Sequence, residues 1–473
     1  MRASIADLQA DFDELLFLCR NAEAELAEAA DQLDAASLLA DTRDLLRRQL
    51  SASQRRYGSA SERVLALRQR ARCECPAPAL LDELRSGKAA LADLLRTEQA
   101  LTAALVVAAD WQSPSFLSSA MPASGRHEGR IRPHVNDYKR DRHLDADAYE
   151  RRYLEAMVDG PLGLGALLTS CGMAAFTTIL SYLAMERELD GPVVAGAGLY
   201  HESRLLLERA VPGGIHWIDE CDTPASLRTI ESVRPCAVFL DSLSNTKWMP
   251  VPALGPILDQ LRGSDTCLVL DNTGLSVACQ PFAQADSVRL IAFESLLKYA
   301  QLGLDRANAG VIIARADDAR KLASYREHLG TNVADVAVHA LPRPDRGVLE
   351  RRLARIQRNA SLLAGQLRER AGLTVEVVYP ELGGCLSIVF NEGEPDPRRE
   401  HALVEAAIAA AARRGVSLIG GSSFGFNTSR IYHTATRADC GEPFVRIAVG
   451  TEDRLELDGL ADALAAAIRE VAR

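Results

Sequence analysis

Lysine is scarce in this chain of 473 residues, which has five lysines among its 54 basic residues, the other 49 being arginines. Lysine can lose its proton and form an imine with an aldehyde, whereas arginine keeps its charge and makes forked hydrogen bonds. The bias itself is what a GC-rich coding sequence produces. A lysine in an apolar setting next to a strand is nevertheless a candidate for chemistry. The five lysines are Lys88, Lys139, Lys247, Lys298 and Lys321.

Other absences exclude whole classes of protein. The longest apolar run, residues 101–109, is too short to cross a bilayer, and the acidic residues between Asp7 and Glu14 interrupt any signal-peptide core. A net charge of −10 gives no electrostatic footprint for nucleic acid. Cys73 and Cys75 form a close pair without a second pair at zinc-ligand spacing, so no metal site is predicted. We expect a cytoplasmic protein with reduced thiols that binds neither nucleic acid nor membrane.

The chain divides into four predicted segments. Residues 1–108 carry leucines at helical spacing and charges of alternating sign, which predicts a helical extension of two or three helices, for packing or dimerisation. Residues 109–133 are rich in Ser, Pro and Gly and predict a linker. Residues 134–345 alternate apolar runs with helical stretches, which predicts a large α/β domain with a mainly parallel sheet. Residues 346–473 predict a smaller C-terminal α/β domain.

Within these segments, the best strand candidates are short apolar runs at residues 192–195, 236–240, 267–270, 288–291 and 310–313. Two long helices are also predicted. One covers residues 349–370, with arginines on its polar side, and an alanine-rich one starts at Leu457.

Three features of the large domain occur in an order that suggests chemistry. Small residues at 169–175 begin a helix, whose amino end can hold a phosphate. Asp271 ends an apolar strand, and ligands of open α/β sheets bind beyond such ends. Lys298 follows the next apolar strand and is flanked by leucines and a tyrosine, which favour a lowered amine pKa. A phosphate site, an acid and a lysine in this order are what pyridoxal phosphate requires.

The stretch from residue 270 (LDNTGLS) through residue 295 (SLLKY) to Asp305 resembles the cystathionine synthase/lyase and methionine γ-lyase family. These are fold-type-I pyridoxal-phosphate enzymes of Cys/Met metabolism, and the resemblance covers roughly residues 130–455. It implies that Lys298 is the Schiff-base lysine, that Asp271 pairs with the ring nitrogen and that Ser295 binds the phosphate. The backbone amides that match the family's phosphate turn are those of Cys171, Gly172 and Met173.

Other positions match the family pattern. Tyr138 and Arg140 resemble residues that reach the phosphate of the neighbouring subunit, which implies a homodimer or homotetramer with shared active sites. Tyr200 matches the tyrosine that stacks on the cofactor ring and assists proton transfer. Asn245 resembles the asparagine near the cofactor oxygen. Arg446 matches the arginine that clamps the substrate carboxylate, a task suited to a forked guanidinium.

The chain also departs from the family pattern. Leu297 stands where the family usually has Thr or Ser, so one phosphate hydroxyl is missing. Residues 417–432 (SLIGGSSFGFNTSRIY) replace the usual Ser-Leu-Gly-Gly-x-Glu-Ser segment, which borders the substrate side chain. Ser417 begins this segment and is expected to bind substrate. We therefore predict that the catalytic machinery is retained while the substrate is not a standard one.

The expected activity is γ- or β-elimination from a side-chain-substituted L-amino acid, with an unsaturated amino acid as one product in specialised metabolism. Lys298 would move the Cα proton, Arg446 would hold the carboxylate, and Tyr200 would assist loss of a γ-substituent. Replacement of the γ-substituent is the main alternative, and aminotransfer is another. A third alternative is a non-catalytic, cofactor-binding protein whose helical arm recruits a partner. The expected ligand in every catalytic case is a small amino acid.

Overall fold

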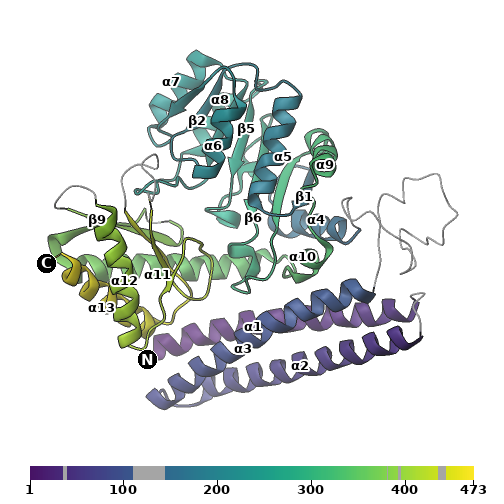
Figure 1. Ribbon diagram of the computed structural model, residues 1–473, viewed down its shortest axis with the longest axis vertical. Helices are drawn as coiled ribbons and strands as arrows, with labels where there is room; N and C mark the ends of the chain where they lie inside the picture. The colour runs from purple at the N-terminus through teal and green to yellow at the C-terminus, as the bar shows by residue number, and fades with distance from the viewer. Residues whose placement is uncertain (36–39, 110–143, 381, 392–395, 435–443, 473) are drawn as a thin grey trace. The chain divides into compact units, whose positions relative to one another are not determined.

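The computed structural model describes residues 1–35, 40–109, 144–380, 382–391, 396–434 and 444–472 (Figure 1). They form two compact units. The first unit comprises Met1–Asp7, Arg187–Leu290 and Gly347–Arg473, and the second comprises Leu8–Glu186 and Ile291–Arg346. Each unit therefore draws on more than one of the predicted segments. Residues 110–133 of the predicted linker lie outside the described residues, as do Tyr138 and Arg140.

The helical extension consists of α1 (Arg2–Ala35), α2 (Ala40–Cys73) and α3 (Pro78–Ala109). Pro78 is the first residue of α3, a position where the missing backbone N–H costs nothing. From residue 8 onward the three helices lie side by side (Figure 1), with Tyr57 of α2 fully buried between its neighbours. Polar contacts also join the helices, because Lys88 of α3 pairs with Asp11 of α1 at 2.7 Å.

The first turn of α1 belongs to the first unit and is anchored there by Asp7. The buried Asp7 carboxylate pairs with Arg355 at 2.9 Å and with Arg358 at 2.7 Å. The same carboxylate accepts the backbone N–H of Arg454 at 3.1 Å, and Ser4 Oγ accepts that of Leu455 at 3.2 Å. One continuous helix thus begins in the first unit and continues in the second.

A seven-stranded sheet has the order β1-β7-β6-β5-β4-β2-β3. Its strands are β1 (Leu164–Thr169), β2 (Val193–Gly196), β3 (Ile215–Ile218), β4 (Ala237–Asp241), β5 (Cys267–Asp271), β6 (Arg289–Ser295) and β7 (Gly310–Arg315). The pairs β2–β3, β2–β4 and β4–β5 are parallel, whereas β7 is antiparallel to β1 and β6. Strands β2 and β4 are buried along their whole length, as expected of strands covered on both faces.

Helices connect these strands. They are α4 (Leu144–Met157), α5 (Gly172–Met185), α6 (His201–Ala210), α7 (Thr223–Val233), α8 (Leu254–Leu261), α9 (Ala316–Leu329) and α10 (Asp335–Ala340), with 3-10 turns η2 (Ser276–Ala278), η3 (Pro281–Ala283) and η4 (Tyr299–Gln301). Local sequence explains several helix starts. Asp222 caps α7, accepting the N–H of Ala225, and a proline follows in the first turn.

The C-terminal part of the first unit is a second α/β layer. It contains α11 (Arg346–Ala371), η5 (Gly372–Thr374), β8 (Val375–Val378), β9 (Cys385–Phe390), α12 (Pro397–Arg413), β10 (Ile419–Gly420), β11 (Arg430–His433), β12 (Val445–Ala448) and α13 (Arg454–Val471). The sheet order is β10-β11-β12-β9-β8, antiparallel except for β10–β11. A capping box of Asp453 and Glu456 starts α13.

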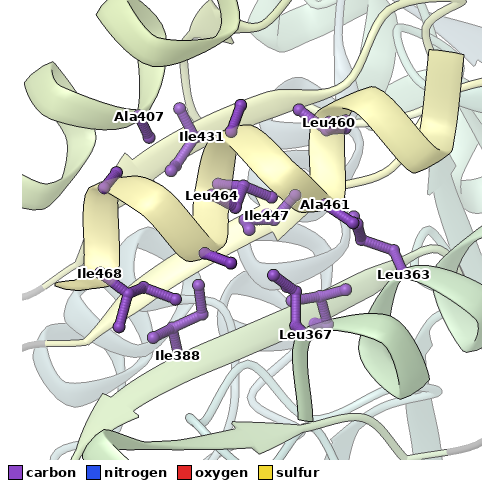
Figure 2. Close-up of a cluster of buried hydrophobic side chains, with 14 of the residues drawn as sticks. Leu363, Leu367, Ile388, Ala407, Ile431, Ile447, Leu460, Ala461, Leu464 and Ile468 are labelled. Atoms are coloured by element: carbon purple, nitrogen blue, oxygen red, sulfur yellow. The ribbon is translucent and has the colours of Figure 1, made fainter. Parts of the chain in front are cut away.

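One face of this second sheet forms the core with α11, α12 and α13. Figure 2 shows Ile431 and Ile447 of the sheet packed against Leu464 of α13 and Leu367 of α11. Side chains alternate between the faces of a strand. The residues next to these isoleucines, including Arg446, therefore lie on the opposite face, away from the core.

The fold confirms the predicted α/β class with a mainly parallel sheet, and all five predicted strands are present. Two further strands of the seven-stranded sheet, β1 and β3, were not predicted. The helix predicted for residues 349–370 is α11, but its arginines are not all on a polar side, because Arg352 is buried. None of the described helices is long and apolar enough to cross a membrane.

Candidate active site

Two aspartates end neighbouring parallel strands of the first unit. Asp241 of β4 and Asp271 of β5 are direct register partners. The carboxylate of Asp271 accepts the backbone N–H of Thr273 at 2.9 Å. Asp241 is buried, and its Oδ2 accepts both the backbone N–H of Tyr200 and the side-chain amide of Asn245, each at 2.8 Å. The strand ends thus bring three of the predicted site residues to one place.

Burial and the nearby charge of Asp271 raise the pKa of Asp241 well above its usual value. The hydrogen bonds from Asn245 and Tyr200 act in the opposite direction but are weaker. Asp241 therefore holds a proton more readily than an ordinary aspartate does. Its neighbour Asp271 is the residue predicted to pair with a protonated ring nitrogen.

Arg446 lies on β12, on the sheet face away from the core. Its Nη2 donates to the backbone carbonyl of Asn245 at 3.2 Å, and its Nη1 donates to the Asn245 side-chain oxygen at 3.4 Å. Since the Asn245 amide nitrogen donates to Asp241, the three side chains form a chain that orients the guanidinium. Tyr432 is the cross-strand partner of Arg446 on β11, and its ring centroid lies 5.9 Å from the guanidinium carbon.

Tyr200 precedes α6 in the same unit, and its side chain is partly exposed. Desolvation raises the pKa of its hydroxyl, and the charge of Glu202, which accepts a hydrogen bond from it, raises it further. Tyr432 and Asp271 contribute in the same direction. Burial also raises the pKa of Tyr432, against the opposing effect of Arg446. Both tyrosines therefore keep their protons at neutral pH and can donate hydrogen bonds.

Several buried polar atoms around this cluster have no hydrogen-bond partner among the described residues. They include Nε of Arg446, Oδ1 of Asp241 and Oγ of Ser387, which is the cross-strand partner of Arg446 on β9. Buried polar groups are normally satisfied, so an unsatisfied set of this kind is expected where a polar ligand binds. The first unit therefore fits a ligand that carries both an anionic and a hydrogen-bonding group.

The predicted phosphate turn lies in the second unit, at the start of α5. Cys171 caps this helix, its sulfur accepting the backbone N–H of Ala174 at 3.3 Å. A Cβ added to Gly172 would lie 2.7 Å from Cβ of Ser295 and 3.2 Å from its Oγ. The turn and the serine are thus in direct contact, with space only for glycine at residue 172. Together they fit a phosphate, because the serine hydroxyl lies at the positive end of the helix dipole.

Lys298 lies just past β6 in this second unit. It is half-buried, between Leu296 and Tyr299, which are both fully buried. By contrast, Lys321 of α9 is exposed and pairs with Glu186 at 3.0 Å. Lys298 thus has buried apolar neighbours along the chain, and its role in catalysis stays a prediction.

Two further predicted residues are Ser417 and Met173. Ser417 is exposed and precedes β10, and Met173 is in the first turn of α5. The segment after Ser417 is tied to α11, because Arg352 donates to the carbonyl of Gly425 at 2.9 Å and to the side chain of Asn427 at 2.8 Å. Contact of Ser417 with substrate stays a prediction.

Three residues of the site region were not predicted: Asp241, Tyr432 and Arg352. Asp241 ends an apolar strand just as Asp271 does, so its position was a usable signal. Tyr432 and Arg352 are brought to their places by strand pairing and tertiary packing, for which the local sequence carries no signal.

Comparison with known proteins identifies the class. The family described as Cys/Met metabolism PLP-dependent enzyme matches residues 96–388, well over half of the chain. The chain therefore belongs to this family and is a pyridoxal-phosphate-dependent enzyme. The resemblance of its sequence motifs to this family is confirmed.

Individual relatives are distant. The bifunctional enzyme flvA of Aspergillus flavus is 26% identical over 320 residues, which cover 64% of this chain and 39% of that protein. The chain thus spans about two fifths of the length of that relative. Cystathionine gamma synthase from Xanthomonas oryzae pv. oryzae, solved with cystathionine, has a TM-score of 0.60 at 20% identity, covering 75% of this chain and 92% of that chain.

A methionine gamma lyase from Micromonospora echinospora, solved without ligand, has a TM-score of 0.58 at 21% identity, covering 74% of this chain and 92% of that chain. These likenesses show that the chain has the fold-type-I architecture predicted from its sequence.

Proposed function

We propose that the chain is a lyase that eliminates a γ- or β-substituent from the side chain of an L-amino acid. The observation that carries this proposal is the orientation of Arg446 by Asn245 in a cluster with Tyr200 and Asp271. A forked guanidinium with an unsatisfied Nε is suited to a carboxylate. The neutral hydroxyl of Tyr200 is suited to donating a proton to a departing group.

The family resemblance assigns each group of the cofactor to particular residues of this chain. The amides of Cys171, Gly172 and Met173, with the hydroxyl of Ser295, would bind the phosphate. Asp271 would accept a hydrogen bond from the protonated ring nitrogen, and Asn245 would lie near the ring oxygen. When bound, pyridoxal phosphate supplies an aldehyde that joins amines and a ring that withdraws electrons from the substrate Cα.

The chain's own residues would move the protons. Arg446 would hold the substrate carboxylate, and the amine of Lys298 would remove the Cα proton. For a γ-substituent a second proton leaves Cβ. The hydroxyl of Tyr200, kept protonated by desolvation and by Glu202, donates toward the leaving group. Tyr432, whose ring lies 5.9 Å from the Arg446 guanidinium, would contribute to the choice of substrate side chain.

The reaction type is tested by mass spectrometry of products from a panel of β- and γ-substituted L-amino acids. Elimination predicts loss of the substituent, with either an unsaturated amino acid or a keto acid and ammonia as product. Addition of thiol or carbon nucleophiles to the same panel tests γ-replacement, the reaction for which a structural neighbour, cystathionine gamma synthase, is named. Exchange of Cα protons without loss of any substituent would contradict the elimination proposal. An aminated cofactor with a keto acid that retains its substituent would indicate aminotransfer.

The role of Lys298 is tested by absorption spectroscopy. The purified protein is expected to be yellow, and Lys298→Ala should lose the band of the lysine-bound cofactor. Lys321→Ala, which removes an exposed lysine from α9, is the matched control and should keep the band. An unchanged spectrum in Lys298→Ala would overturn the proposed site.

We further propose a homodimer or homotetramer in which Tyr138 and Arg140 complete the phosphate site of the neighbouring subunit. Mixed oligomers of Arg140→Ala and Lys298→Ala chains should then recover part of the activity. Failure of such mixtures to recover any activity would indicate self-contained sites. A cytoplasmic location is proposed as well, and cell fractionation tests it.

A further inference from the structure

The helical extension contacts the loop that follows Lys298. Arg96 of α3 donates from Nε to the backbone carbonyl of Leu304 at 3.2 Å. Leu304 is buried, so its carbonyl requires a partner from the protein. The Nη1 of the same arginine pairs with Asp93 one turn earlier at 3.0 Å, which orients the guanidinium along the helix. Residue 96 is also where the match to the enzyme family begins.

The loop in question, residues 296–307, is built around the buried side chain of Gln301. Its amide nitrogen donates to the carbonyls of Leu296 at 3.1 Å and Ala307 at 2.7 Å. Its amide oxygen accepts the backbone N–H groups of Arg306 at 2.7 Å and of Ala307 at 2.8 Å. Gln301 thus closes the two ends of the loop on each other, with Lys298 inside the closed segment.

The tip of this loop has a backbone that its sequence does not favour. Leu302 and Asp305 have φ of 51° and 53°, in the left-handed region, and Gly303 between them has φ of 80°. Non-glycine residues stay in this region only where surrounding contacts hold them. Leu304 lies between Gly303 and Asp305, so Arg96 binds the loop at its most strained part.

A second contact fixes the position of α3 relative to α10. Gln99, one turn after Arg96, donates to the backbone carbonyl of His339 on α10 at 3.1 Å. The oxygen of the Gln99 side chain accepts the hydroxyl of Tyr57 at 3.4 Å, and Tyr57 is fully buried in the helical extension. The packing of the three helices therefore determines where α3 presents Arg96.

We propose that Arg96 is a positioning residue for the catalytic lysine. By holding the carbonyl of Leu304, it fixes the loop that carries Lys298. The helical extension thereby contributes to positioning the catalytic lysine. This inference rests on the proposed role of Lys298 as the lysine that joins the cofactor. It goes beyond the expectation that the extension serves for packing or dimerisation.

The test compares three variants of the full-length chain. Arg96→Met removes the donor and keeps the length of the side chain, and Arg96→Lys restores a donor. Arg47→Met is the matched control, because Arg47 is an exposed arginine of α2 that also pairs with an aspartate three residues earlier, at 3.3 Å. Amide hydrogen exchange of peptides covering residues 296–307 is measured with and without pyridoxal phosphate. The midpoint of the pH titration of the cofactor absorption band is measured in parallel.

Arg96→Met loses a charged hydrogen bond. Its backbone amides at residues 302–307 should therefore exchange hydrogen at least about tenfold faster than those of the wild type. The same variant should shift the midpoint of the band titration and lower kcat several-fold with little change in KM. Arg96→Lys should recover part of each effect, and Arg47→Met should behave as the wild type. Unchanged exchange and titration in Arg96→Met would overturn the inference. Failure of the proposed function appears separately, as an unchanged absorption band in Lys298→Ala.

Discussion

Asp241 and Asp271 are direct cross-strand partners at the ends of β4 and β5, so two carboxyl groups lie side by side where the cofactor ring is proposed to bind. Burial together with the charge of Asp271 raises the pKa of Asp241. A neutral Asp241 can still accept the hydrogen bonds of Tyr200 and Asn245, because each is a donor. Asp241 thus orients its neighbours, whereas Asp271 is the residue proposed to pair with the ring nitrogen of the cofactor.

This relationship predicts different effects for the same substitution at the two positions. Asp241→Asn keeps the acceptor for Tyr200 and Asn245, so kcat at neutral pH should change by less than about threefold. Asp271→Asn removes the anion, and kcat should fall about 10- to 100-fold, as expected for loss of a charged hydrogen bond. Steady-state kinetics of both variants at saturating pyridoxal phosphate measures the difference. Equal losses in the two variants would contradict the assignment.

The pair also predicts a pH dependence of stability. A carboxyl whose pKa is higher in the folded than in the unfolded state adds stability at low pH, and this contribution is lost as the pH rises through the folded-state pKa. Since the pKa of Asp241 is raised, the wild type should lose stability relative to Asp241→Asn as the pH rises above the ordinary aspartate range. Urea unfolding across pH measures this difference.

Arg446 is expected to determine affinity for the substrate. Arg446→Lys keeps the charge but loses the forked donor, so KM for the amino acid should rise about 10- to 100-fold, with a smaller change in kcat. Arg413→Lys, on an exposed position at the end of α12, is the control and should leave KM unchanged. A KM for Arg446→Lys close to that of the wild type would argue against carboxylate binding at this position.

The contact between Gly172 and Ser295 predicts that residue 172 tolerates no side chain. In Gly172→Ala the new Cβ would overlap Cβ of Ser295, and such overpacking typically costs about 1–3 kcal/mol of unfolding free energy. Affinity for pyridoxal phosphate, measured by absorption titration, should fall as well. In Gly365→Ala, within α11, the new Cβ has no heavy atom within 4 Å. This control should leave cofactor affinity unchanged and add up to about 1 kcal/mol of stability.

The raised pKa of Glu25, a residue of α1 in the second unit, predicts that the free energy of unfolding depends on pH. Desolvation raises the pKa of its carboxyl from 4.5 to about 7, and Glu28 adds to the increase. The nearby side chains of His339, Arg152 and Arg343 oppose the increase without cancelling it. Its Oε2 has no hydrogen-bond partner among the described residues.

The sign follows from the raised pKa. The stability that Glu25 contributes is present below its unfolded-state pKa and is lost as the pH rises through about 7. Glu25→Gln should therefore be nearly neutral at pH 5 and stabilising by on the order of 2 kcal/mol at pH 8.5. Glu62→Gln, at an exposed position of α2, is the control for urea unfolding at both pH values. A difference between Glu25→Gln and wild type that does not change with pH would refute this account.

The strands that were predicted from the sequence are those buried on both faces, because their apolar runs are continuous. β3 (Ile215–Ile218) is an edge strand with an exposed His216, and β1 (Leu164–Thr169) contains a glycine, so neither has such a run. The antiparallel direction of β7 could not be predicted either. Strand direction depends on how the chain connects across the sheet rather than on local pattern.

In the candidate site, too, some residues could be predicted from the local sequence and others could not. Lys298 and Asp271 were found because they follow apolar strands at positions that the chemistry requires. Arg352 was expected on a polar helix face, yet it is buried and bound to residues 73 and 75 positions later in the chain. Contacts over such distances depend on tertiary packing, and the local sequence around a residue carries no signal of them.

The anchoring of α1 by Asp7 has a consequence for how the chain folds during synthesis. Arg358 and Arg454 follow Asp7 by 351 and 447 residues. At elongation rates of about 5–20 residues per second, roughly 20–90 s pass before all the partners of the Asp7 carboxylate exist. The first turn of the helical extension can therefore complete its native contacts only after Arg454 has been synthesised, long after the turn itself.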